Sequence, residues 1–219
     1  MNDALTYAKY FIKNGYNTKR NTLDGNMKLQ KMLLFANLIS IAELEKPLFN
    51  DEILAFRNGC VVESVRLRYQ NDYNSLVADS MNFNPDFSQE EYDVLNLCVS
   101  IFGRLSAREL SDINHAFDFW NEAYQVSIVG SNSWNKNLAL VTTEKQMLEI
   151  QKMKDVIASF KKTENENKKI EIINGIEFIY SPSEISLTDE VLVELYKFSD
   201  TASDRSYSVY LDDGKLVIF

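Results

Sequence analysis

The sequence predicts a mainly α protein, in which a compact helical domain over residues 1–160 precedes a small ββαββ element over residues 170–219. Three observations predict this organisation. Several segments space their apolar residues three and four positions apart, which is the period of an amphipathic helix. Serine or threonine residues that are followed three positions later by Glu or Gln mark helix starts. After the polar run 161–169 the apolar residues alternate at period two, which is typical of hairpins.

The first part of the chain is expected to be built on one buried helix. Residues 28–44 are apolar on nearly every side, and a helix with so little polar surface normally lies at the centre of a domain. An amphipathic helix over residues 3–14 precedes it, and Pro47 is expected to end it. Residues 14–27 contain two Gly and four Asn, so we expect a loop between the two helices.

An extended block follows the buried helix. Residues 52–62 are expected to form two strands around a turn at Arg57-Asn58-Gly59, and residues 62–70 a short helix with its apolar side turned inward. Residues 71–87 carry no clear period and end at Pro85, so we expect them to be irregular.

Three capping boxes predict the remaining helices of the domain. In such a box the cap hydroxyl accepts a hydrogen bond from the amide three positions on, and the side chain at that position returns one to the cap amide. An Asn- and Ser-rich stretch over residues 125–141 is expected to be a long loop. The boxes are Ser88 with Glu91, opening a helix to about residue 102; Ser106 with Glu109, to about 117; and Thr143 with Gln146, to about 162.

The C-terminal part is expected to be a separate element. Residues 161–169 contain no apolar side chain and are the best candidate for a linker. Residues 170–180 are expected to form two strands joined at Asn174-Gly175, a dipeptide that favours tight hairpin turns. Thr188 is expected to cap a short helix, and residues 206–219 to form a second hairpin.

Composition excludes several classes of protein. Of the 219 residues 45% are hydrophobic and 25% charged, which is typical of a globular chain rather than a disordered one. Cys60 and Cys98 lie alone in apolar runs, which argues against a disulfide scaffold or a Cys-based zinc module and fits a reducing compartment. The longest apolar runs are too short to cross a membrane. The first residues lack the pattern of a signal peptide, so we expect a cytoplasmic protein.

The charge is negative and unevenly distributed. The chain carries a net charge of -9, whereas a generic nucleic-acid binder is basic, so nucleic acid is not the expected partner. Residues 170–219 hold 3 basic and 10 acidic side chains. Such a concentration of acid favours a basic protein partner, with Glu190, Asp212 and Asp213 as candidate contacts. The alternative is a solvated surface that keeps the protein in solution.

No catalytic, cofactor-binding or metal-binding residues are expected. His115 is the only histidine, and with Asp112 and Asp118 nearby it is the one candidate for a metal ligand or general base. The alternative is a histidine that stabilises the end of its helix. Metal sites need three or four ligands and no second cluster is visible, which favours the structural interpretation. We expect Cys60 and Cys98 to pack in the core rather than to act as nucleophiles.

One basic cluster stands at the start of the buried helix. It comprises Lys19, Arg20, Lys28 and Lys31. A nucleic-acid contact is one interpretation, and a solvated helix start is the one we expect.

The two least ordinary stretches, 27–70 and 106–124, resemble the Panacea domain, the SocA-like antitoxin family of bacteria and their phages. In that family a helix of the form KLQKLLYF leads through an LF segment to an extended block, IxAWRxGPVVxxVYxxY, and later to SAxELSxxTHxxxPWxxA. The resemblance runs from Ala4 to Tyr124. This chain departs from the pattern with Phe56 in place of Trp, and with Cys60 and Phe119 in place of Pro. The positions singled out by the motifs, which we interpret as structural, are Lys28, Gln30, Arg57, Asn58, Gly59, Ser106, Glu109, His115 and Trp120.

The resemblance implies a non-enzymatic antitoxin that binds and neutralises a cognate toxin encoded beside it. Masking of the toxin and its delivery to a protease both remain open as mechanisms. The C-terminal residues 170–219 lie outside the resemblance and are the expected site of partner choice, because their strand edges are able to pair with a partner. The alternatives are a phage or mobile-element protein that binds a host factor or nucleic acid, and an enzyme that depends on His115.

Overall fold

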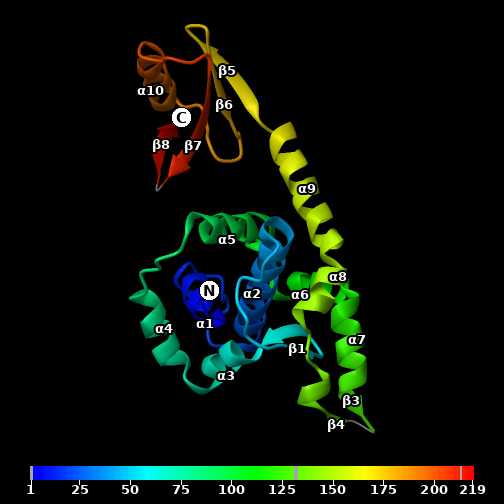
Figure 1. The fold of residues 1–219 in the computed structure, drawn as a ribbon. Coiled ribbons are helices and arrows are strands. Elements are labelled where there is room, and N and C mark those ends of the chain that lie inside the picture. Colours follow the sequence, from blue (N-terminus) through cyan, green and yellow to red (C-terminus); the bar gives the residue numbers. More distant parts are fainter. Residues whose placement is uncertain (1, 131–132, 213) are drawn as a thin grey trace. The chain divides into compact units, whose positions relative to one another are not determined.

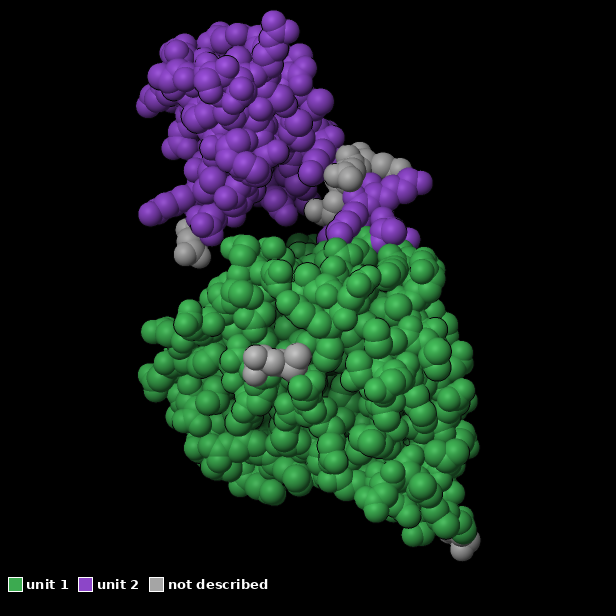
Figure 2. Space-filling view, viewed as in Figure 1, with its two compact units in different colours: residues 1–157 green, residues 158–219 purple. Residues whose placement is uncertain are grey.

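The structure is a computed structural model and describes residues 2–130, 133–212 and 214–219 (Figure 1). The chain divides into two units, which Figure 2 colours separately: unit 1 is Met1–Ile157 and unit 2 is Ala158–Phe219. Helices predominate among the described residues, and the strands form small sheets. The prediction of a mainly α protein is therefore confirmed.

The elements that begin in unit 1 are mostly helices. They are α1 (Ala4–Lys13), α2 (Leu23–Leu44), β1 (Ile53–Phe56), β2 (Gly59–Val62), α3 (Glu63–Asn71), α4 (Tyr73–Met81), α5 (Gln89–Phe102), α6 (Ala107–His115), α7 (Asp118–Ser127), β3 (Ile128–Val129), β4 (Ser133–Trp134), the 3₁₀ turn η1 (Lys136–Leu138), α8 (Thr143–Leu148) and α9 (Ile150–Glu166).

Helix α2 forms the centre of unit 1. Its residues from Leu29 to Ala42 are all buried, as the apolar run predicted. Figure 1 shows α2 beside α1, α5 and α6, and its side chains share one hydrophobic core with theirs. Within this core the rings of Phe35 on α2 and Phe102 on α5 stack with centroids 4.3 Å apart. The remaining helices of the unit are held in place by packing on this central helix.

Two of the three predicted capping boxes are present in full. The Ser88 hydroxyl accepts from the amide of Glu91 while the Glu91 carboxylate accepts from the amide of Ser88, which starts α5. Ser106 and Glu109 make the same exchange at the start of α6. These reciprocal bonds satisfy amides that a helix leaves without partners at its first turn.

The start of α2 was predicted too late. The helix begins at Leu23 rather than at residue 28, because the Thr22 hydroxyl caps it by accepting from the Gly25 amide at 3.1 Å. The Asn- and Gly-rich composition of this turn concealed the cap. The helix ends at Leu44, and Glu45 adopts a left-handed conformation (φ 56°), so it stops before Pro47.

The prediction of an irregular segment after α3 is wrong, because helix α4 occupies Tyr73–Met81. This helix buries only Leu76 and Ser80, so its apolar period is too weak to see in the sequence. Its packing against α1 and α3 compensates for the weak local preference, as tertiary contacts commonly do.

The region after α6 is more regular than predicted. Helix α7 enters the stretch expected to be a loop, and a short β3–β4 pair follows it. Helix α8 is capped by Thr142, whose hydroxyl accepts from the Lys145 amide, rather than by Thr143. Helix α9 continues to Glu166, so the linker expected over 161–169 is largely helical. That segment has no Gly or Pro to stop a helix, and its Lys and Glu residues favour one.

Unit 2 consists of a four-stranded sheet and one helix beyond the end of α9. Its elements are β5 (Lys169–Ile173), β6 (Ile176–Tyr180), α10 (Asp189–Ser199), β7 (Ser206–Asp212) and β8 (Lys215–Ile218). The strand order is β5-β6-β7-β8, and β6 and β7 run parallel because α10 connects them. Phe198 of α10 packs edge-on against Phe178 and Tyr207, which places the core on one face of the sheet.

Candidate functional site

The motif residues of α2 fasten the β1–β2 hairpin to the centre of unit 1. The Gln30 carboxamide oxygen accepts from the Val62 amide at 2.7 Å, and its nitrogen donates to the Asn26 side chain at 3.2 Å. One position further on, the Lys31 Nζ donates to the carbonyl oxygen of Cys60 at 2.8 Å. The side chains of both Gln30 and Lys31 are buried, so these bonds form out of contact with water.

The turn of the hairpin is held by α6. The Asn114 Oδ1 accepts from the Cys60 amide at 2.5 Å, and the Ser111 hydroxyl donates to the Asn58 carbonyl at 2.9 Å. Gly59 has φ +96°, and a Cβ there would lie 2.2 Å from Asn114 Oδ1 and 2.7 Å from Lys31 Nζ. Only glycine permits this approach, which explains why the Arg57-Asn58-Gly59 turn ends in glycine.

The other end of the motif, on α6 and α7, braces strand β1. The Trp120 Nε1 donates to the Phe56 carbonyl at 2.8 Å. The His115 ring stacks on Trp120 with centroids 3.8 Å apart, and Trp120 in turn stacks on Tyr124. The structure therefore gathers Gln30, Gly59, His115 and Trp120 around one hairpin, and each of them holds the fold.

The environment of His115 favours the neutral form of its imidazole. Burial and the nearby Lys31 charge lower the pKa of His115, while Asp112 and a hydrogen bond to the Arg57 backbone oppose the shift. Its buried Nε2 makes no hydrogen bond within the described residues. No group of three or more His, Cys, Asp or Glu side chains in the described part of the chain is placed to hold a metal ion.

The two cysteines are buried in the core. Burial raises the pKa of the Cys60 thiol to about 12, although Lys31 and Asn114 oppose the shift. Burial also raises the pKa of Cys98. A thiol attacks as the thiolate, so neither group is activated as a nucleophile.

The basic cluster predicted at the start of the central helix is not one surface. The Lys28 Nζ donates to the Gly103 carbonyl at 2.8 Å, and Lys31 lies in the core at 1% exposure. Lys19 and Arg20 remain exposed in the preceding loop. The expectation that Lys31 is solvated is therefore wrong, because the face of α2 that carries it is covered by the hairpin.

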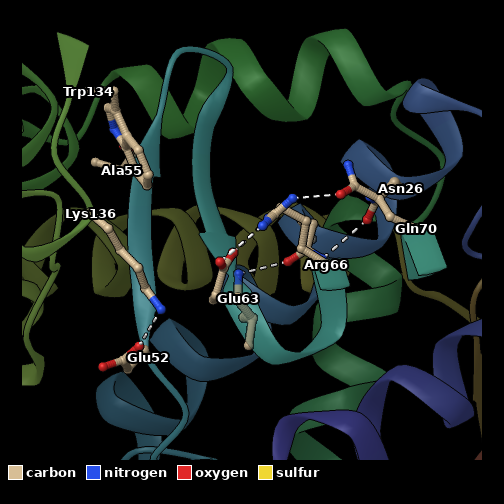
Figure 3. Close-up of polar contacts among 10 residues, drawn as sticks. Asn26, Glu52, Ala55, Glu63, Arg66, Gln70, Trp134 and Lys136 are labelled. Carbon is tan, nitrogen blue, oxygen red and sulfur yellow. Dashed lines mark hydrogen bonds and ion pairs between the residues drawn. The ribbon is translucent and has the colours of Figure 1, made fainter. Parts of the chain in front are cut away.

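A pocket opens beside the hairpin, between α2, α3 and the β1–β2 turn. Its volume is about 210 Å³. Figure 3 labels three of its lining residues, Asn26, Arg66 and Gln70, with Asn26 and Gln70 close together on one side of Arg66. The residues that line the pocket are Leu23, Asn26, Met27, Gln30, Lys31, Phe56, Arg57, Asn58, Val61, Arg66 and Gln70.

Arg66 is fixed in orientation at this pocket. Its Nε and one terminal nitrogen donate to the two carboxylate oxygens of Glu63 at 2.6 and 3.0 Å, and its other terminal nitrogen donates to Gln70 at 2.6 Å (Figure 3). The guanidinium lies 5.3 Å from the centroid of the Phe56 ring, a cation–π distance. The position of this charge is therefore set before any ligand arrives.

The acidic residues proposed for partner binding lie elsewhere, in unit 2. Glu190 is exposed in the first turn of α10, where the Thr188 side chain and backbone amides lower its pKa. Asp212 is exposed at the end of β7, opposite Lys215. Asp213 lies outside the described residues. Their role in binding stays a prediction.

The sequence does not indicate this pocket. Arg66, Gln70 and Met27 carry no motif that distinguishes them from surface residues. Lys31 offered a usable signal, because it is a charged residue within the apolar run that forms the central helix. A charge in such a position is either paired or functional.

Comparison with models of protein families gives a match. Residues 29–121 match the family described as antitoxin SocA-like, Panacea domain. The matched segment contains Gln30, Gly59, His115 and Trp120, and it is shorter than the predicted span from Ala4 to Tyr124. The family resemblance is thereby confirmed over this segment. The curated proteins and the solved structures gave no match, and no helix among the described residues is long and apolar enough to span a membrane.

Proposed function

Because residues 29–121 match the family described as antitoxin SocA-like, Panacea domain, we propose that this protein is an antitoxin that neutralises a cognate toxin by direct protein–protein binding. The family match is the observation that carries the proposal. The environments of Cys60 and Cys98 support a role without thiol catalysis, because burial raises the pKa of both thiols and so disfavours the nucleophilic thiolate.

We assign the toxin-binding surface to unit 2. Helix α10 covers one face of its sheet, and the alternation of the strands places other apolar side chains on the opposite face. Ile170, Ile172 and Phe219 on that face are 56%, 66% and 69% exposed. The ring of Tyr210 lies against Phe219 at 5.5 Å between centroids. Exposed apolar side chains gathered on one face are typical of a protein-binding surface.

The edges of the same sheet support this assignment. Strands β5 and β8 stand at the two ends of the strand order, so each has one side without a strand neighbour in the sheet. A partner is able to add a strand at such an edge through main-chain hydrogen bonds. Residues 170–219 are also strongly acidic, which favours a basic toxin and steers its approach.

Growth rescue tests the proposal. The reading frame adjacent to this gene is expressed alone and together with this protein, and colony formation is counted. We expect the neighbour to stop growth and this protein to restore it. A neighbour that is harmless when expressed alone would contradict the antitoxin function. It would favour the alternative of a phage or mobile-element protein that binds a host factor.

The part of unit 2 in neutralisation is tested by deletion. A chain that ends at residue 157 keeps the whole of unit 1. We expect it to accumulate as a folded protein and to lose the rescue. Full rescue by the shortened chain would place the toxin surface on unit 1 instead.

A further inference from the structure

The pocket beside the hairpin is cationic. Three of its eleven lining residues are Lys31, Arg57 and Arg66, and none of the eleven is acidic. The remaining polar side chains in the lining are neutral amides, namely those of Asn26, Gln30, Asn58 and Gln70. The nearest carboxylate in the hydrogen-bond network is Glu63, and both of its oxygens are occupied by Arg66. A pocket of this composition favours an anionic ligand.

Lys31 is the most deeply buried of the three cations, at 1% exposure. Its Nζ is bonded to the neutral carbonyl of Cys60, and it makes no ion pair within the part of the chain that the structure describes. Buried charges in proteins are normally paired with an opposite charge, because removal from water is costly. The ammonium has two further N–H donors, and it lines an open pocket.

The two arginines add directional donors. Arg66 keeps a fixed guanidinium plane through its bonds to Glu63 and Gln70. Arg57 lies in the exposed turn and makes no ion pair among the described residues. Guanidinium groups match the geometry of phosphate and carboxylate oxygens, so a small anion has donors from more than one direction.

The rest of the wall is apolar. Met27 and Val61 line it together with the Phe56 ring, and Leu23, which is 70% exposed, stands at its border. The volume of about 210 Å³ is below the range of about 300–1,000 Å³ that is common for drug-sized ligands. The space therefore suits a small molecule with an anionic head and a short flat body.

We propose that this pocket binds a small organic anion, with its phosphate or carboxylate group at Lys31 and Arg57 and its apolar part against Phe56 and Met27. The site is distinct from the sheet of unit 2 that we assign to the toxin, and it requires no toxin for its test. A bound anion would neutralise the buried charge of Lys31. It would thereby stabilise the attachment of the hairpin to α2.

The experiment uses the full chain and three probes: inorganic phosphate, acetate and phenyl phosphate. Binding is followed in the methyl spectrum of the methionines, because Met27 lines the pocket while Met153 is fully buried elsewhere. Sodium chloride at matched ionic strength is the reference. We expect phosphate or acetate to shift the Met27 signal and leave Met153 unchanged. Phenyl phosphate should bind more tightly than phosphate, because its ring adds contact with the apolar wall.

Two charge-removing variants, each with a matched control, test the assignment. Lys31→Met should weaken binding of the preferred probe by about tenfold or more, because it removes a charged hydrogen-bond donor from the anion. Lys28→Met, on the same helix but bonded to Gly103, should leave the affinity unchanged. Arg57→Gln should weaken binding with the fold intact, whereas Arg108→Gln on the exposed side of α6 should not.

Three results would overturn the proposal. One is a Met27 shift no larger than that caused by sodium chloride. The second is equal affinity in the Lys31→Met and Lys28→Met proteins together with equal affinity in the two arginine variants. The third is binding of phenyl phosphate no tighter than that of phosphate. This result would show that the apolar wall does not contact the ligand and would contradict an organic anion as the ligand.

Discussion

The Nζ of Lys31 lies 2.8 Å from the carbonyl oxygen of Cys60, and this hydrogen bond ties the central helix α2 to strand β2. The lysine is charged and yet almost wholly buried, and it lies in the stretch of α2 from Leu29 to Ala42 in which every residue is buried. The contact therefore fastens the β1–β2 hairpin at the expense of burying a cation.

The burial of Lys31 predicts a pH-dependent stability. Burial lowers the pKa of Lys31 from 10.5 to about 8, so between these values the unfolded chain binds a proton that the native chain has released. The free-energy cost of holding the charged lysine in the core therefore applies in full below pH 8, and it decreases as the pH rises above 8. Lys31→Met should therefore be at least as stable as the natural chain at pH 7, with an advantage that shrinks by pH 9. Urea unfolding at both pH values measures this difference.

The groups that face Lys31 do not obscure this trend. The Cys60 thiol has its pKa raised to about 12, and the pKa of His115 is lowered. Lys13→Met, which removes an exposed lysine from the end of α1, serves as the control and should show a constant difference. An advantage of Lys31→Met that grows with pH would refute the assignment of a protonated buried lysine.

Gly59→Ala should strongly destabilise unit 1. The new methyl group would lie 2.2 Å from Asn114 Oδ1 at a backbone φ of +96°, so it meets both a clash and left-handed strain. Together these are expected to cost roughly 3–4 kcal/mol. Unfolding is followed by tryptophan fluorescence, because both tryptophans, Trp120 and Trp134, lie in unit 1.

Gly15→Ala is the matched control for that substitution. Gly15 also has a positive φ, +83°, but no atom lies within 4 Å of the added Cβ. Strain alone should cost about 1 kcal/mol. Equal losses in the two variants would mean that the contact with Asn114 does not govern the requirement for glycine.

His115→Ala separates a structural histidine from a catalytic one. The ring stacks on Trp120, which holds the Phe56 carbonyl of β1, so its removal should lower stability by about 1–2 kcal/mol. His115→Phe keeps a flat ring, so it should recover most of the lost stability. It should also rescue growth. An enzyme that depends on His115 would instead lose activity in both variants, with an unchanged melting temperature in His115→Ala.

The acidic surface of unit 2 predicts salt-dependent association with the toxin. Changing Glu190, Asp212 and Asp213 together to Lys should slow association at low salt and have little effect at high salt, because such steering is screened over about 8–10 Å. Stopped-flow mixing with the purified toxin measures the rate. The control changes three exposed acids of unit 1 to Lys, namely Asp86, Glu122 and Asp155. An equal effect of both triple variants would show that net charge alone matters.

Local rules predicted the parts of the fold that depend on local bonds. The boxes at Ser88 and Ser106 start α5 and α6 as expected, and the turn at Gly59 joins two strands. Where tertiary packing determines structure the predictions failed. Helix α4 buries only two residues, and its existence depends on the neighbours that it packs against.

The candidate site was only partly predictable for the same reason. The family pattern singled out Gln30, Gly59 and Trp120 as structural positions, and the structure gathers them at the hairpin. Nothing in the sequence indicated that Arg66, three residues into α3, would lie over the Phe56 ring. The burial of Lys31 depends on the hairpin, a segment distant in the sequence, whose Cys60 carbonyl accepts the hydrogen bond from Lys31.

Co-purification with the toxin tests the central claim most directly. This protein, tagged and co-expressed with the product of the adjacent reading frame, is isolated and passed through size exclusion under the conditions that rescue growth. We expect the two proteins to elute together, and the chain that ends at residue 157 to elute without the toxin. Rescue of growth by a protein that never associates with the toxin would contradict neutralisation by direct binding.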